Sequence, residues 1–499
     1  MLGGGAAFAE AYDFNYWAMT DTQRAHVRTA IARIMYAAPY YGVGLAPEAI
    51  TSNWESLNTF QLIMLMAMEG ETSAGVEGFD TNYFNSYFTN AMGAMYGFLT
   101  YGWHPSGAKK ITLNGQVTGA GGFKVIWDAY SVVLGSALND FAGDITLGGS
   151  DTLGSGSTAI VQLGVDNTIP SGAGKGKIVF TYGAAKQGVL DLNSHNAQVN
   201  GLVSADNTGA LVDNKSGSGS YTLTVGGNNA SCYFGGVIVN TTGNINLTKT
   251  GAGTLTLSQT NSYSGSTLVN SGALTLSSYA TIPTTPLIGI GGGAMLNVAG
   301  LTNIFTLAAS QILSNSAAGT GVVCGNFNDT AGTNSFAYTN GMPCLLVTNG
   351  TFTLGAATVF KLNNVGPALL PGSYKLIARA ATGTAGNVAG ALPALSVNGV
   401  AAGATATLQF SSGELFLNVT ATNPPVLGGI QLAGTNFILT GTNGIAGANF
   451  YVLAATNLIL PMSNWTFIAT QQFGTGGSLN FTNPFNPNSP QSFYRLRLP

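Results

Sequence analysis

Residues 247–278 read LTKTGAGTLTLSQTNSYSGSTLVNSGALTLSS, and this stretch decides the fold. Two short apolar segments, Leu255–Leu257 and Leu274–Leu276, recur 19 residues apart. The residues between them are mostly Gly, Ser, Asn and Thr, which turn a chain at little steric cost. A period near 20 residues with one apolar strand per repeat is typical of a β-solenoid, because one coil cannot bury its apolar face alone and stacked coils share a core.

The composition supports a repetitive, exported β-protein. Of the 499 residues, 70 are glycine and only 7% are charged, whereas about 25% is usual in soluble domains. The polar groups that hydrate the surface must therefore come from Ser, Thr, Asn and the backbone. Such a surface fits a secreted protein better than a cytosolic enzyme. The formal net charge is −3 and the chain has no basic block, so nucleic-acid binding is not expected.

The strand pattern recurs throughout residues 141–423, which we expect to form the solenoid. Apolar residues alternate there with Thr and Asn, so that one side chain in two points inward. The predicted strands are Asp144–Leu147, Val189–Leu192, Tyr221–Val225, Gly236–Val239, Thr254–Leu257, Ala273–Leu276, Thr351–Leu354, Thr405–Phe410 and Leu415–Val419. The open ends of such a stack invite aggregation unless they are capped.

Residues 1–115 are predicted to form an α-helical block. Thr20–Gln23 has the spacing of a capping box, and apolar residues follow it at helical intervals until Pro39. Further helices are expected over Trp54–Met68 and from Asp80 to Gly102. Residues 116–140 then serve as a linker, within which 125–138 is either a last helix or the first coil. The helical block would cap one end of the solenoid.

Residues 424–499 are expected to form a small antiparallel β-sandwich that caps the other end. The two prolines at 424 and 425 mark its boundary. In the last predicted strand, three apolar residues alternate with Arg495 and Arg497. The other predicted strands are Gly434–Leu439, Asn449–Ala454, Trp465–Ala469 and Ser478–Phe481.

Residues 188–278 resemble the autotransporter-associated β-strand repeat. The resemblance lies in GVLDLNSHNAQVNGLVS, SGSYTLTVGG and FGGVIVN, and above all in the run quoted at the start. Residues 343–420 are similar to the segment that often closes such repeats. The resemblance implies a right-handed parallel β-helix in a large secreted or surface protein of a Gram-negative-type bacterium. It also implies a C-terminal module that caps, anchors or sorts the chain.

A second resemblance concerns the N-terminal block. Asn53-Trp54 and the segment Phe98–Gly107 look like parts of the helical toroid of heparinase- and alginate-lyase-type enzymes. The family cuts uronic-acid polysaccharides by β-elimination, with Tyr and His as acid and base, which makes Tyr101 and His104 the candidate catalytic residues. This chain departs from the family because Ala108-Lys109-Lys110 replaces an acidic Glu-Gly pair. The toroid also needs about 300 helical residues, far more than this block holds.

The remaining polar clusters are predicted to be structural. His26 and His195 are expected on a solvated helix face and in a coil turn. Glu69, Glu71 and Glu77 are expected in a solvated loop rather than as a carboxylate pair for glycoside hydrolysis. Asp140 and Asp144 could share a face, but no repeated Asp ladder accompanies them to bind calcium. Gly172–Lys177 superficially resembles a phosphate loop, but it lacks the required spacing and precedes a strand, so we expect a solenoid turn. No cofactor and no metal site are implied.

Cysteine content and apolar runs narrow the class of protein further. Cys232, Cys324 and Cys344 do not form a disulfide framework, and buried thiols are favoured over a pair between Cys324 and Cys344. The longest apolar run, Leu62–Met68, is far short of the roughly 20 residues of a transmembrane helix. The N-terminus lacks the positive region of a signal peptide, and we expect Met1 to lie inside a longer protein.

Together these observations predict a secreted or cell-surface structural β-helix, a stalk or adhesin-like passenger rather than an enzyme. Its expected partners are polysaccharides or other cell surfaces, and its oligomeric state is left open. The alternative is a truncated or fused polysaccharide lyase acting on uronic-acid polysaccharides, with the solenoid as its carrier.

Overall fold

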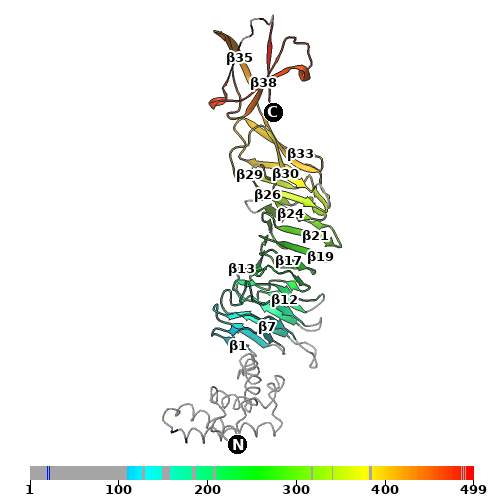
Figure 1. Cartoon of the computed structure of the whole chain (residues 1–499). Helices are drawn as coiled ribbons and strands as arrows, with labels where there is room; N and C mark the ends of the chain where they lie inside the picture. The colour runs from blue at the N-terminus through cyan, green and yellow to red at the C-terminus, as the bar shows by residue number, and fades with distance from the viewer. Residues whose placement is uncertain are drawn as a thin grey trace.

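The computed structural model describes Thr20, Thr22 and residues 110–498, with gaps at 126–129, 149–157, 182–186, 206–208, 316–318, 340, 381–384, 485, 487 and 489–490. From residue 110 onward the chain forms a long column of stacked strands that ends in a small antiparallel module (Figure 1). The helical block predicted for residues 1–115 lies almost entirely outside the described residues. Its last part is not helical, since Lys110–Leu113 is the first strand, β1.

The column has three faces, each a stack of parallel strands that the chain visits in turn. The first face begins with β1 (Lys110–Leu113), β4 (Tyr130–Leu134), β7 (Thr158–Leu163), β9 (Gln187–Asp191), β12 (Ala210–Asp213) and β15 (Val237–Ile238). Farther along the column, a second sheet continues this face. Its strands are β22 (Phe305–Thr306), β25 (Phe327–Asp329), β28 (Gly350–Leu354) and β31 (Gly386–Gly390).

The second face starts with the pair β2 (Thr118–Gly119) and β5 (Asp140–Phe141). It continues as a nine-stranded parallel sheet. The strands of that sheet are β10 (Ala197–Val199), β13 (Ser220–Val225), β16 (Asn244–Lys249), β18 (Thr267–Val269), β20 (Leu287–Ile290), β23 (Ile312–Asn315), β26 (Thr333–Tyr338), β29 (Val359–Asn364) and β32 (Ala394–Asn398).

The third face begins with β3 (Phe123–Val125), β6 (Ile145–Leu147), β8 (Ile178–Phe180) and β11 (Leu202–Val203). A bridge between Ser204 and Phe234 joins it to the next sheet. That sheet holds β14 (Cys232–Phe234), β17 (Thr254–Leu257), β19 (Ala273–Ser278), β21 (Met295–Leu301), β24 (Gly321–Cys324), β27 (Leu345–Thr348), β30 (Gly372–Arg379), β34 (Glu414–Ala421) and β33 (Ala404–Ser411).

The decisive 19-residue recurrence is one turn of this coil. Strands β17 and β19 pair in parallel with Leu255 opposite Leu274 and Leu257 opposite Leu276. All four leucines are fully buried, and the threonines between them are half-buried on the outer surface. The predicted alternation is therefore confirmed in these two strands: apolar side chains stack in the core from coil to coil, and polar ones stack outside.

The period is less regular than the sequence suggests. Val132 pairs with Val161, so that coil takes 29 residues rather than about 20. Residues 116–140 contribute β2, β3 and β4, which pair with later strands and favour the first-coil alternative over a last helix for 125–138. Longer coils put their extra residues into turns, which leaves the strand register intact.

Glycines permit the close stacking of the turns. Gly272 has a φ of +66°, and a Cβ built there would lie 2.3 Å from the carbonyl oxygen of Gly253 and 2.4 Å from that of Gly251 in the preceding coil. Only glycine accepts both the left-handed conformation and this contact. Gly293 adopts a similar φ of +75°, but nothing lies within 4 Å of its Cβ position. A side chain at either position would be strained by the left-handed backbone, but only at Gly272 would its Cβ also collide with the preceding coil.

The column closes by a change of strand direction. β30 is parallel to β27 on one side and antiparallel to β34 on the other, and β33 then pairs antiparallel with β34. Aromatic rings fill the interior on the way, with Phe305, Phe327 and Phe352 stacked at centroid distances of 4.9 Å. An antiparallel hairpin at the end gives the last parallel strand a partner and covers its edge.

Residues 426–498 form two three-stranded antiparallel sheets around a separate core. One sheet holds β35 (Val426–Ala433), β36 (Asn436–Thr442) and β39 (Leu479–Pro484), and the other holds β38 (Thr466–Gln472), β37 (Asn449–Ala455) and β40 (Phe493–Arg497). Two short 3-10 helices, η4 (Met462–Asn464) and η5 (Thr475–Gly477), lie in the connections. Ala401 of the column belongs to this core and links the two parts. None of the helices in the described part of the chain has the length and apolarity of a membrane span.

Candidate functional site

The residues with the strongest catalytic resemblance cannot be placed. Tyr101 and His104 lie outside the described residues, as do His26 and the carboxylates Glu69, Glu71 and Glu77. Their roles therefore stay predictions.

His195 lies in the turn after β9, where its surroundings are structural. Its Nδ1 is 3.4 Å from Oδ1 of Asp166 in the preceding coil. Asn196 donates to both oxygens of Asp166 from its backbone and side-chain nitrogens. These two hydrogen bonds from Asn196, helped by His195, hold the pKa of Asp166 below its usual range. The group links two coils.

The glycine-rich segment Gly172–Lys177 forms a turn before β8. The Asn200 side chain of the next coil accepts from the backbone nitrogen of Gly172 and donates to the carbonyl oxygens of Gly172 and Lys175. The amide thus occupies the Gly172 nitrogen, a donor that a bound phosphate would use, and two carbonyl oxygens of the turn.

Asp140 and Asp144 are tied to the same turn. Asp140 accepts from Nζ of Lys175 at 2.5 Å, and Asp144 accepts from the backbone nitrogen of Lys177 at 2.7 Å. Within the described residues, no group of three or more His, Cys, Asp or Glu side chains is placed to hold a metal ion.

The three cysteines are free thiols. Cys344 is buried, and burial raises its pKa to about 12. Burial also raises the pKa of Cys232 and Cys324. Thiols that resist ionisation are poor nucleophiles. The expected burial holds for Cys344, whereas Cys232 and Cys324 are half-buried.

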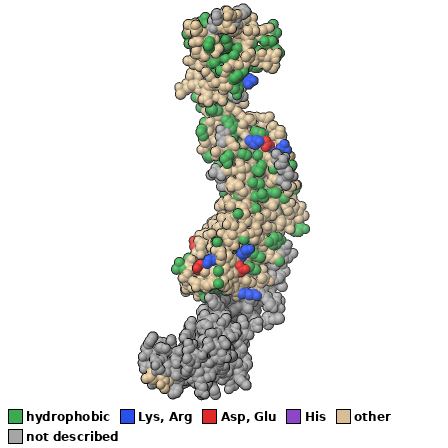
Figure 2. Space-filling view, in the orientation of Figure 1, with side chains coloured by type: hydrophobic (Ala, Val, Ile, Leu, Met, Phe, Trp, Pro, Cys, Tyr) green, Lys and Arg blue, Asp and Glu red, His purple; other side chains and the backbone are tan. Residues whose placement is uncertain are grey.

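The middle of the column has a surface without charge. Residues 216–360 contain two charged side chains, Lys249 and Asp329, and both are buried, with 1% and 0% exposure. Figure 2 shows the same pattern on the visible face, where charged side chains gather in two bands with an uncharged length between them. We call residues 216–360 the uncharged belt. A molecule that binds to the belt therefore contacts hydroxyls, amides, backbone and apolar groups.

Lys249 holds two turns of the belt together from inside. It ends β16 and takes a core position between Val225 and Val269 of the adjacent coils. Its Nζ donates to the carbonyl oxygen of Gly251 at 2.8 Å, to that of Ser271 in the next coil at 3.3 Å, and to Thr250. Burial lowers its pKa, and the three carbonyls compensate for the lost water.

Asp329 is the second buried charge. Its carboxylate accepts from the backbone nitrogen of Gly332 at 2.8 Å and from the side-chain amide of Asn334 at 2.6 Å. Burial raises the pKa of Asp329, and these hydrogen bonds oppose the rise. Oδ1 of Asn334 has no hydrogen-bond partner among the described residues. Burial of the ionised carboxylate therefore has a desolvation cost that these hydrogen bonds offset only in part.

We predict that Asp329 makes the protein less stable as the pH rises. A carboxyl group with a raised pKa binds its proton more tightly in the folded state, so its contribution to stability is present near pH 4 and is lost as the pH passes the folded pKa. The variant Asp329→Asn removes this slope, because an amide does not titrate. A flipped Asn334 can accept from the new amide, so the hydrogen bond between the two side chains is kept. Urea unfolding of both proteins between about pH 4 and pH 7 measures the effect, and parallel slopes would contradict it.

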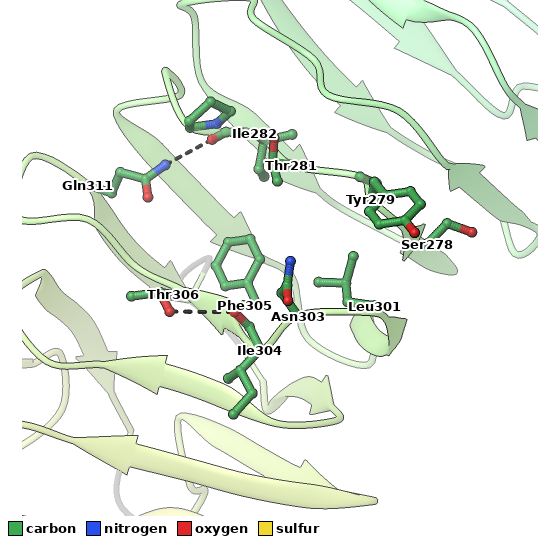
Figure 3. A pocket seen from close by; sticks show the side chains of 12 residues that line it. Ser278, Tyr279, Thr281, Ile282, Leu301, Asn303, Ile304, Phe305, Thr306 and Gln311 are labelled. Carbon is green, nitrogen blue, oxygen red and sulfur yellow. Dashed lines mark hydrogen bonds between the residues drawn. The ribbon is translucent and has the colours of Figure 1, made fainter. Parts of the chain in front are cut away.

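A groove opens in the belt where the first face is interrupted. Between β15 and β22, the described residues of this face hold only an isolated bridge between Thr260 and Thr281. The groove has a volume of about 260 Å³ and is lined by segments 278–283 and 301–306 together with Gln311. Figure 3 shows these two segments facing each other across it. The missing strand on this face thus leaves a hollow in the surface.

The walls of the groove combine exposed apolar surface with neutral polar groups. Tyr279 and Ile304 are 68% and 61% exposed, whereas Phe305 is buried. Gln311 is fixed: it donates to the carbonyls of Ile282 and Thr285 and accepts from the Ala308 nitrogen. Further polar side chains on the walls come from Ser278, Thr281, Asn303 and Thr306. The groove was not predicted from the sequence.

The terminal module exposes a second unusual surface. All eight residues of β35 are exposed, and β35 lies at the edge of its sheet. Ile430 and Leu432 pair with the buried Leu439 and Phe437 of β36, so they project on the core side of the sheet, yet they are 56% and 68% exposed. The second sheet leaves this strip uncovered.

One comparison with known proteins gives a match. Residues 247–276 match the sequence model of the passenger-associated-transport-repeat family. No curated protein matches the chain. The matched segment runs from the end of β16 through β19 and contains Lys249, Gly251 and Gly272, the residues that join successive turns. This repeat and the stacked parallel strands that carry it fit an autotransporter-passenger β-helix repeat protein.

Proposed function

We propose that the protein is a secreted or cell-surface structural β-helix, a stalk or adhesin-like passenger on the outside of a Gram-negative-type bacterium. The observation that carries the proposal is the uncharged belt, whose two charged side chains, Lys249 and Asp329, both point into the core. A catalytic cleft needs titratable groups within reach of the substrate. The belt offers a long, neutral contact surface instead.

The terminal module supports a role at the end of the stalk. Residues 426–498 share a core with Ala401 of the column, and the apolar strip of β35, on the core side of its sheet, is left exposed. We infer that the module caps the β-helix and serves in anchoring or sorting the chain. The N-terminal block, proposed as the cap of the other end, lies outside the described residues.

Adhesion by a neutral surface has a measurable signature. Beads coated with the full chain should bind target cells with nearly equal strength at about 0.05 M and 1 M salt, because screening acts only on charges. Beads coated with a basic control protein give the salt-sensitive reference. A fall of more than about tenfold over this range would show that charged parts of the chain carry adhesion, against the proposal.

The alternative is a lyase acting on uronic-acid polysaccharides. It predicts that the purified chain releases unsaturated uronates, which absorb ultraviolet light, from alginate or heparin. We expect no such absorbance from the wild-type chain. A robust signal that disappears in His104→Ala would overturn the structural proposal and establish the lyase alternative.

A further inference from the structure

The groove at the interrupted first face is a recess in the described part of the belt. We propose that it binds a neutral saccharide, one or two sugar residues of an uncharged polysaccharide chain that runs across the column. The inference rests on the proposed function, since such a ligand is met outside the cell.

The charge of the surroundings selects the class of ligand. The groove lining contains no acidic, basic or histidine side chain. The nearest charged residues in sequence, Lys249 and Asp329, have no surface exposure beyond 1%. Sulfated and uronic-acid glycans, phosphates and charged peptides gain affinity from ion pairs and charge-assisted hydrogen bonds, and the groove offers neither.

The side chains that remain match a sugar. Tyr279 presents an exposed ring with a hydroxyl at its tip, an amphipathic surface that suits the apolar face of a pyranose. Asn303, Ser278 and Thr306 supply neutral donors and acceptors for its hydroxyl groups. The volume of about 260 Å³ is just below the range of about 300–1,000 Å³ usual for small-molecule sites, which limits the contact to one or two rings.

A peptide strand is a poorer occupant. Strand addition needs free backbone groups at a sheet edge, but those in the wall segment are partly engaged. The carbonyl oxygen of Thr281 accepts from the Asn261 nitrogen at 2.9 Å, and the Ala280 nitrogen donates to Ser277 at 3.0 Å. The carbonyl of Ile282 is engaged by Gln311.

Calorimetric titration of the purified full chain with defined hexasaccharides tests the proposal. The probes are linear hexasaccharides of glucose, mannose and galactose, with hexamannuronate as the charged counterpart. We expect at least one neutral probe to bind, and Tyr279→Ala and Asn303→Ala each to weaken it, the former by about tenfold or more. Tyr233→Ala is the matched control, because Tyr233 is 38% exposed in the same belt but outside the groove lining.

The outcomes separate the groove from the wider function. Neutral binding that is lost in Tyr279→Ala and kept in Tyr233→Ala supports the site, with circular dichroism confirming that each variant is folded. The inference is overturned by tighter binding of hexamannuronate, by neutral binding that neither groove variant changes, or by no binding of any neutral probe. In these cases exposure of the chain on intact cells would still support the proposed function.

Discussion

Replacing Gly272 by alanine is expected to lower the free energy of unfolding by about 3–4 kcal/mol. About 1–2 kcal/mol of this comes from the left-handed backbone conformation, and the rest from the new methyl group. That group would lie 2.3 and 2.4 Å from two carbonyl oxygens of the preceding coil. Because the coils are stacked on both sides, neither turn can move away without breaking strand pairs.

Gly293→Ala isolates the contact from the strain. Gly293 has nearly the same φ but no atom within 4 Å of its Cβ position, so we expect a loss of only about 1–2 kcal/mol. Urea unfolding of the two variants side by side measures the difference. Equal losses would mean that the turns of successive coils are not in contact at Gly272.

Lys249→Glu is expected to be the most damaging single charge change, costing more than about 4 kcal/mol. The substitution places a carboxylate where three carbonyl oxygens point at an ammonium group. All of these oxygens are acceptors, so the new charge would be buried without a donor. The turn at residues 250–251 and the turn at Ser271 of the next coil would lose the group that joins them.

Two controls separate the buried ammonium from charge in general. Lys215→Glu makes the same change on an exposed side chain and should alter the urea midpoint little, since surface substitutions are usually within about 0.5 kcal/mol. Lys249→Met keeps the apolar stem and removes only the donors, so it should fall between the two. If Lys249→Glu were as mild as Lys215→Glu, the inward position of Lys249 would be wrong.

The strands of the column could be predicted from sequence where period-2 alternation is strong. Leu255 and Leu274 recur at the interval of one coil, and their pairing follows directly from that recurrence. The matched family repeat covers the same stretch. Alternation is a local property of the chain, so it survives without knowledge of the neighbours.

Features that depend on neighbouring coils were not predictable in this way. Lys249 ends an alternating strand, but its inward position is favourable because three carbonyl oxygens accept from its ammonium group, one of them from Ser271 of the next coil. The groove beside Tyr279 arises from a strand that is absent on one face, and absence leaves no motif. The coils of residues 110–140 were assigned to a helical block and a linker because their strands are short and interrupted by glycine.

The central claim is that the protein is displayed outside the cell, and surface labelling tests it most directly. Ile459 is 90% exposed in the terminal module, so Ile459→Cys provides a reactive thiol, whereas burial raises the pKa of all three native thiols. Intact cells that express the full chain are treated with a maleimide on a polyethylene glycol chain too large to cross an outer membrane. We expect Ile459→Cys to be labelled as fully on intact cells as after lysis, with little labelling of the wild type. Labelling that appears only after lysis would contradict the account.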